Sequence, residues 1–213
     1  MKRLIALGVV TIASVCLFAT PAMPQQAGKV LLIIRDAKVA DPAVLDWVIT
    51  KEAGVMTETL QKAGYQVEVA SPTGEPWGTP GHVLKIDRKL KDVNVADYKA
   101  LVIPCMAIDS TDLHADLAAV VKSAVQTGKL VAAQNGGVAM LAKAGVLSGK
   151  KYAALEITGM EFKDGIYTGS GVVKDGGIIT SGICPAMGRE FKGMQDGTPK
   201  LMETLIAELK QAK

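Results

Sequence analysis

Aromatic residues are scarce in this chain: Phe, Trp and Tyr make up only 4% of its 213 residues. A core with so few rings must be built from aliphatic side chains, and the 22 glycines are available for turns. With 49% hydrophobic and 21% charged residues, the composition is typical of a globular protein and excludes a disordered chain. The length suits one well-buried domain and is too short for two comfortable ones.

Metal-ligating and nucleic-acid-binding patterns are also missing. The chain has two histidines and three cysteines, without a CxxC spacing or a His/Cys cluster, so we expect no zinc site and no metal or cofactor. It has no run of Lys and Arg and no aromatic stacking platform, so we expect no nucleic-acid partner. Internal repeats, linkers and low-complexity segments are absent as well.

The one long hydrophobic run stands at the N-terminus. Lys2 and Arg3 precede the uncharged segment Leu4–Ala19, and small residues follow at 20–22. This pattern predicts a signal peptide over residues 1–22, because the run is short for a transmembrane helix, which needs about 20 residues. An uncleaved anchor or a lipoprotein that uses Cys16 is the alternative. Cleavage would remove two of the three net positive charges, and the mature protein would be periplasmic or secreted, without a membrane attachment.

After a polar lead-in over 23–28, strand and helix signals alternate through a single α/β domain over 29–213. Short apolar runs that start and stop abruptly are typical of buried parallel strands, and they occupy residues 29–35, 66–70, 100–104 and 130–133. An Asp-Gly turn predicts a hairpin over 172–180. Helical periodicity covers four segments: 41–62 with a break at Gly54, 111–127, 138–143 and 198–211. This order predicts a doubly wound, mainly parallel sheet with helices on both faces.

In such sheets, ligands bind beyond the carboxyl ends of the strands. Three segments follow directly after predicted strands and are therefore expected to meet at one edge: residues 104–106, 134–137 and 181–184.

Residues 128–150, which contain Gln134-Asn135-Gly136-Gly137, resemble the nucleophile-elbow segment of the ThiJ/PfpI family. Residues 60–72 and 97–104 and the predicted hairpin resemble further parts of that family in the same order, so the resemblance spans most of 29–210. It implies a flavodoxin-like fold of the class I glutamine amidotransferase type, and a homodimer.

The resemblance also assigns site positions. Asn135 falls on the family's nucleophilic cysteine, Glu52 falls on the glutamate that hydrogen-bonds the cysteine sulfur, and Cys105 and Met106 replace two glycines of the oxyanion loop. The expected binding residues all lie at the same edge of the sheet: Gly136, Gly137, Met106 and Cys184.

A carboxamide cannot replace a thiolate as a nucleophile, because its nitrogen lone pair is delocalised. Asparagine tolerates a positive φ, which explains how it could occupy an elbow. We therefore expect a pseudoenzyme that binds a small molecule or serves a stress-related role. The alternative is a hydrolase or lyase, hydratase-, glyoxalase- or amidase-like, in which Glu52 activates water and Asn135 orients the substrate, or in which Cys105 is the nucleophile.

The state of Cys105 and Cys184 remains open between a disulfide, two inert thiols and one reactive thiol at Cys105. An exported protein meets an oxidising compartment, which favours a disulfide. Against it, the elbow strand is expected to separate the two loops, and two strand spacings of about 4.8 Å exceed the Cα separation of about 7 Å that a disulfide tolerates. A bridge would require the loops to lean together over Asn135.

We predict that the exported protein begins near Met23, because the residues at 20–22 fit a signal-peptidase site. Intact-mass measurement on protein from its native host tests this. A mass that includes residues 1–22 would overturn it.

Overall fold

The computed structural model describes residues 27–34, 46, 49–78, 81–105, 115–155, 162, 164–190 and 192–212. Several predicted features lie outside the described residues: the leader over 1–22, most of the lead-in, the start of the helix at Asp41, the first residues of the helix over 111–127, and Met106.

A seven-stranded sheet forms the centre of the domain, in the order β10-β11-β7-β6-β1-β2-β5. Its strands are β1 (Lys29–Ile33), β2 (Gln66–Ser71), β5 (Arg88–Lys89), β6 (Ala100–Ile103), β7 (Leu130–Gln134), β10 (Val172–Asp175) and β11 (Ile178–Ser181). All neighbours are parallel except β10 and β11, which form the antiparallel hairpin. The mainly parallel doubly wound sheet is therefore confirmed.

The helices are η1 (Ile49–Ala53), α2 (Gly54–Lys62), α3 (Ala115–Gln126), α4 (Gly136–Lys143), α5 (Pro185–Glu190) and α6 (Thr198–Gln211), with the single-turn segments η2 (Leu90–Asp92) and η3 (Val95–Asp97). Two small ribbons complete the fold: β3 (Trp77–Gly78) with β4 (Val83–Leu84), and β8 (Lys151–Tyr152) with β9 (Ile166–Tyr167). Within the described part of the chain, every helix is too short or too polar to cross a bilayer.

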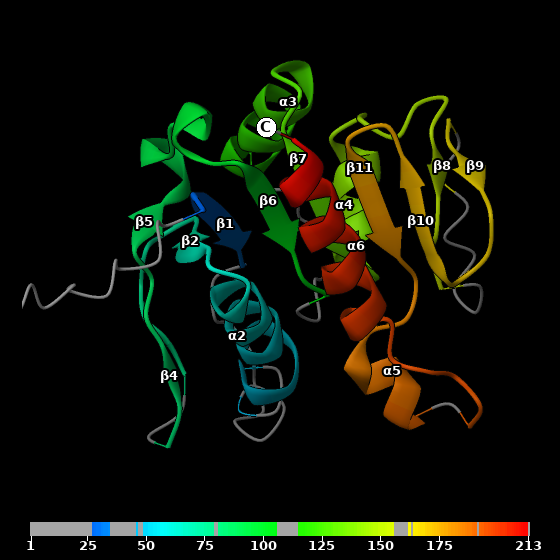
Figure 1. Cartoon of the computed structure of the whole chain (residues 1–213), viewed down its shortest axis with the longest axis horizontal. Coiled ribbons are helices and arrows are strands. Elements are labelled where there is room, and N and C mark those ends of the chain that lie inside the picture. The colour runs from blue at the N-terminus through cyan, green and yellow to red at the C-terminus, as the bar shows by residue number, and fades with distance from the viewer. Residues whose placement is uncertain are drawn as a thin grey trace, which may run out of the picture.

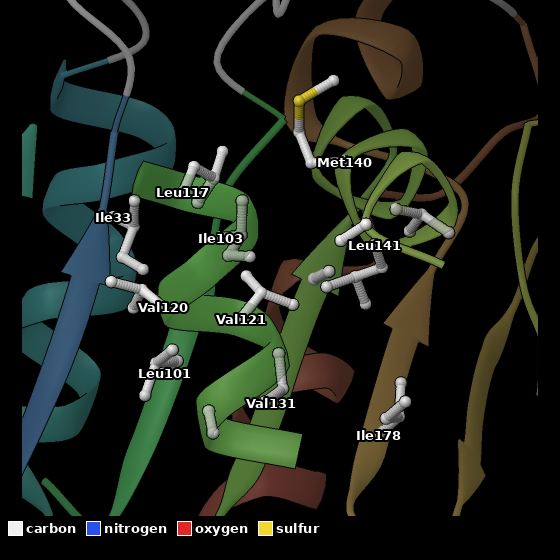
Figure 2. Packing of buried hydrophobic residues seen from close by; sticks show 14 of the residues in the cluster. Ile33, Leu101, Ile103, Leu117, Val120, Val121, Val131, Met140, Leu141 and Ile178 are labelled. Carbon is white, nitrogen blue, oxygen red and sulfur yellow. The ribbon is translucent and has the colours of Figure 1, made fainter. Parts of the chain in front are cut away.

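Alternate residues of the central strands build two separate cores. On one face, side chains such as Leu31, Leu101 and Val131 pack against α3 and α4, as Figure 2 shows for Leu117 and Val121 of α3. On the other face, the intervening residues of the same strands pack against α2 and α6, and α6 crosses in front of the sheet in Figure 1. Strands buried on both faces read as continuous apolar runs, which is why the sequence revealed them.

Most element boundaries agree with the sequence prediction to within one or two residues. The C-terminal helix has the predicted bounds, and the hairpin turns at Gly176–Gly177. Gly54 does not break its helix: the chain changes there from a π-helical turn, η1, to the α-helix α2. A Cβ at Gly54 would lie 2.5 Å from the carbonyl oxygen of Ile49, so the wider turn requires glycine at this position.

A buried carboxylate ties the edge of the sheet together. Glu68 of β2 accepts hydrogen bonds from Lys29 Nζ at 2.7 Å, Tyr98 OH at 2.7 Å and Arg88 Nε at 3.2 Å. These donors, the Lys29 ammonium foremost, lower the pKa of Glu68 to about 2. Burial, and then the hydrogen bond to the same carboxylate, raise the pKa of Tyr98.

We predict that Glu68→Gln destabilises the fold by about 1–2 kcal/mol at pH 7, because three donors lose a charged acceptor. The folded-state pKa of Glu68 lies below the unfolded value of about 4.3, so this stabilisation is present above that value and is lost as the pH falls towards about 2. Urea unfolding from pH 7 to pH 3 measures it.

The matched control is Glu203→Gln, which removes an exposed ion pair with Lys200 on α6 and should change stability by less than about 0.5 kcal/mol. Equal effects of the two substitutions, or an unchanged pH dependence in Glu68→Gln, would show that the Glu68 cluster contributes no special stability.

Candidate functional site

The turn from β7 into α4 places Asn135 at the carboxyl edge of the sheet, between the loops that follow β6 and β11. Its backbone has φ 42° and ψ −105°. Among the described residues it is the only one other than glycine with a positive φ. The predicted elbow is therefore present, as a sharp strand-to-helix turn at this position.

The tolerance of asparagine for positive φ explains this conformation only in part. That tolerance applies to the left-handed region, where ψ lies near +30° to +60°, and Asn135 lies far outside it. The surroundings hold the backbone there instead: Asn135 N–H donates to the Ser181 carbonyl at 2.7 Å, and Val138 N–H donates to the Asn135 carbonyl at 2.9 Å. Such strained residues persist where neighbours over-determine them, and they cluster at functional sites.

Gly137 allows the helix to start this close to β6. A Cβ at Gly137 would lie 2.3 Å from the carbonyl oxygen of Ile103, so any other residue would push α4 away from the strand. Its neighbour Gly136 directs its backbone N–H to the sulfur of Cys105. Gly137 therefore brings the elbow close to β6, and the binding of a ligand by the two glycines stays a prediction.

Glu52 lies in the π-helical turn η1 and is 2% exposed. Its Oε1 accepts a hydrogen bond from the backbone N–H of Cys105 at 2.7 Å. π-Helical turns occur often at functional sites, because the widened turn redirects a side chain. The carboxyl group of Glu52 therefore fixes the position of the loop that carries Cys105.

The Cys184 sulfur is the acceptor on which the site converges. Asn135 Nδ2 donates to it at 3.5 Å, and its pKa is coupled to that of the Cys105 thiol. The backbone N–H groups of Ala186 and Met187 add two further donors. The hydrogen bond from Cys105 is the largest cause that lowers the pKa of Cys184, to about 6, and burial opposes it. The lowered pKa favours the thiolate form of Cys184.

Cys105 has the opposite character. Its role as donor to Cys184 raises its pKa well above the ordinary value, and burial and the nearby Glu52 carboxyl raise it further. Both cysteines are free thiols in the structure. The sequence analysis predicts that the elbow strand separates their loops, and this is confirmed: β7 lies between β6 and β11. The pKa values of the two thiols are nevertheless coupled, so the loops that carry them lie near one another.

Sequence reasoning missed the residues that hold the Cys184 loop in place. Gln134, the last residue of β7, is fully buried and donates from Nε2 to the Ile183 carbonyl at 2.9 Å and to Thr198 Oγ1 at 3.0 Å. The Thr198 hydroxyl donates to Asp196 Oδ1 at 2.7 Å. The only available sequence signal was a glutamine at the end of an otherwise apolar strand, since its partners lie far away in the chain.

The structure thus brings together four of the predicted site residues, Glu52, Cys105, Asn135 and Cys184, around one pair of sulfurs. Met106 lies outside the described residues. Within the described ranges, no group of three or more His, Cys, Asp or Glu side chains could hold a metal ion.

This arrangement can be set beside known proteins. The family model described as DJ-1/PfpI matches residues 43–192. An uncharacterized protein from Methanocaldococcus jannaschii is 31% identical over 193 residues, which cover 85% of this chain and 89% of the relative.

Solved structures agree in fold. A ThiJ/PfpI domain protein from Brachyspira murdochii superposes with a TM-score of 0.65 at 16% identity, over 89% of this chain and 99% of that one. DJ-1beta from Drosophila melanogaster superposes with a TM-score of 0.61 at 23% identity, over 86% of this chain and 96% of that one. The family model covers more than half of the sequence and the architecture is shared, so this chain belongs to the DJ-1/PfpI family.

Proposed function

We propose that this protein is an exported, stress-related member of the DJ-1/PfpI family whose reactive group is the thiolate of Cys184, and that its elbow residue Asn135 takes part as a hydrogen-bond donor. The observation that carries the proposal is the contact of the elbow side chain: the Asn135 amide donates to the Cys184 sulfur at 3.5 Å, and the pKa of this sulfur is lowered. Donors that converge on one sulfur favour its charged form, which is the nucleophilic one.

The other candidate groups are less suited to covalent chemistry. The carboxamide of Asn135 lacks a nucleophilic lone pair. Cys105 carries its proton at neutral pH, because it donates to Cys184 and lies near the Glu52 carboxyl. Glu52 is buried and accepts the Cys105 N–H. It is therefore better placed to fix the Cys105 loop than to act as a general base on a water molecule.

The proposed activity is the capture of small electrophiles by Cys184, without hydrolytic turnover. Cys184 is 1% exposed, so only small reagents can approach its sulfur. This combination agrees with the expectation of a family member that lacks elbow catalysis, and it relocates the thiol chemistry from the elbow to the facing loop.

We predict that iodoacetamide labels Cys184 with a rate that follows one ionisation with a midpoint near pH 6, whereas Cys105, although more exposed, reacts only at alkaline pH because its pKa is raised. The midpoint is the informative quantity, because burial lowers the absolute rate at every pH. Peptide mass spectrometry at a series of pH values measures it on the chain carrying Cys16→Ser, in which Cys105 and Cys184 are the only cysteines.

Three variants separate the causes. Cys105→Ser keeps a donor to Cys184 and should keep the midpoint low, whereas Cys105→Ala removes the donor. If the pKa of Cys184 then returned to the ordinary value of about 8.5, its thiolate fraction at pH 7 would fall roughly 30-fold. Asn135→Gly tolerates the positive φ and removes only the amide, so it should raise the midpoint by less than Cys105→Ala.

A midpoint of Cys184 at the ordinary value, or labelling of Cys105 before Cys184, would overturn the proposal. Turnover of methylglyoxal or of amides that is lost in Asn135→Ala and retained in Cys184→Ser would also contradict it, because the chemistry would then reside at the elbow.

A further inference from the structure

The peptide that joins Ile183 to Cys184 is held at its carbonyl from two sides. The Ile183 carbonyl accepts the side-chain amide of Gln134 at 2.9 Å and the backbone N–H of Gly197 at 2.9 Å. Gln134 is the last residue of β7, and Gly197 directly precedes α6. A Cβ at Gly197 would lie 2.2 Å from Ser181 Oγ, so glycine is needed for this close approach. Two elements that are distant in the sequence therefore fix the residue before Cys184.

The chain after Cys184 is held as well. The Cys184 carbonyl accepts the backbone N–H of Gly188 in α5 at 3.0 Å. Gly188 packs on the segment that leads into α6: a Cβ at Gly188 would lie 3.1 Å from the backbone nitrogen of Asp196 and 3.5 Å from the Met194 carbonyl oxygen. Figure 1 shows α5 beside the start of α6. The segment 194–198 thus contacts the Cys184 loop on both sides of the cysteine.

Thr198 connects these contacts to one another. Its hydroxyl oxygen accepts a hydrogen bond from Gln134 Nε2 at 3.0 Å, and the hydroxyl donates to Asp196 Oδ1 at 2.7 Å. The same carboxylate oxygen accepts the Thr198 N–H at 2.9 Å. Gln134 and Thr198 are fully buried, whereas Asp196 is exposed. A chain of hydrogen bonds therefore runs from a surface carboxylate, through two buried side chains, to the Ile183 carbonyl.

The chemistry of the partners fixes the direction of each hydrogen bond in this chain. A carbonyl can only accept, so the atom of Gln134 that faces Ile183 must be the amide nitrogen. The Thr198 hydroxyl has a single proton, and the charged carboxylate of Asp196 is its strongest acceptor. The chain thus has one consistent order of donors and acceptors, and it specifies one position of the Ile183–Cys184 peptide.

This position brings the Cys184 sulfur to the elbow. Gln134 and Asn135 are neighbours in the sequence, so the side chain that holds the Ile183 carbonyl stands next to the one that donates to the sulfur at 3.5 Å. That distance is long for a hydrogen bond, and a small displacement of the loop would break the contact.

We propose that Gln134 and Thr198 are positioning residues for the chemistry of Cys184: they hold the Ile183–Cys184 peptide so that the sulfur stays within reach of the Asn135 amide. This inference rests on the proposed function, since it takes Cys184 as the reactive group. It assigns to the last residue of β7 and to the start of α6 a control of reactivity that neither exerts by touching the reagent.

The test uses the full chain carrying Cys16→Ser. Thr198→Val replaces the hydroxyl by a methyl group of similar size, so it removes the link between Asp196 and Gln134. We expect the pH midpoint of Cys184 alkylation by iodoacetamide to rise by about half to one unit, which lowers the thiolate fraction below the midpoint roughly three- to tenfold. Thr198→Ser keeps the hydroxyl and should restore the original pH profile.

Thr204→Val is the matched control on the same helix. It removes a solvent-exposed hydrogen bond from a threonine hydroxyl to the Lys200 carbonyl, and it should leave the pH profile unchanged. Gln134→Met is a second probe, since methionine has a similar length but cannot donate to Ile183, and it should raise the midpoint at least as much as Thr198→Val. Urea unfolding measures the stability of each variant. Lower stability with an unchanged midpoint in Thr198→Val and Gln134→Met would show a structural role only, and would overturn the inference.

A double-mutant cycle tests whether Thr198 acts through Asn135. In the chain carrying Asn135→Gly the amide donor is already absent, so Thr198→Val should move the midpoint much less than it does when Asn135 is present. Equal shifts in the two backgrounds would contradict the proposed route.

The outcomes separate this inference from the proposed function. If Cys184 has a midpoint near pH 6 and neither Thr198→Val nor Gln134→Met moves it, the proposed function stands and the inference is wrong. If Cys184 has an ordinary midpoint in the chain carrying only Cys16→Ser, both proposals fail. Should Gln134→Met not fold, the comparison of Thr198→Val with Thr198→Ser decides the inference alone.

Discussion

The backbone of Asn135, held at φ 42° and ψ −105°, is the constraint on which the site depends. This conformation ends β7 and starts α4 within one residue, and it directs the carboxamide across to the loop after β11. It is stabilised from both sides, by the Ser181 carbonyl of β11 and by the close approach of Gly137 to Ile103 of β6. The strain at the elbow is thus sustained by the same two strands whose loops carry the cysteines.

This geometry gives asparagine a role at a position where the family is expected to have a nucleophile. The side chain is a donor rather than an attacking group, and its acceptor is the sulfur of Cys184. Glu52 holds the Cys105 loop by accepting its backbone N–H. In the proposed function, the asparagine at the elbow and the cysteines in the flanking loops act together, with the negative charge on Cys184, one strand away from the elbow.

Much of the fold could be read from the sequence, because strands buried on both faces appear as continuous apolar runs and the Asp-Gly turn marks the hairpin. The ribbons β3–β4 and β8–β9 escaped prediction, since two-residue strands carry no periodicity. The helix α5, with six residues, is likewise too short to show a helical period. The site was predicted as a set of loops at one sheet edge, but its central contact was not. Strand spacing argued against a meeting of Cys105 and Cys184, and Gln134, Ile183 and Thr198, which hold one loop, are far apart in sequence.

The location of the negative charge is the central claim, and direct titration of thiolate absorbance in the ultraviolet tests it. In the chain carrying Cys16→Ser, the account predicts one thiolate that ionises with a midpoint near pH 6 and disappears in Cys184→Ser, with the second thiol protonated well into the alkaline range. Two thiols that both titrate at ordinary values, or a low midpoint that survives in Cys184→Ser, would contradict it.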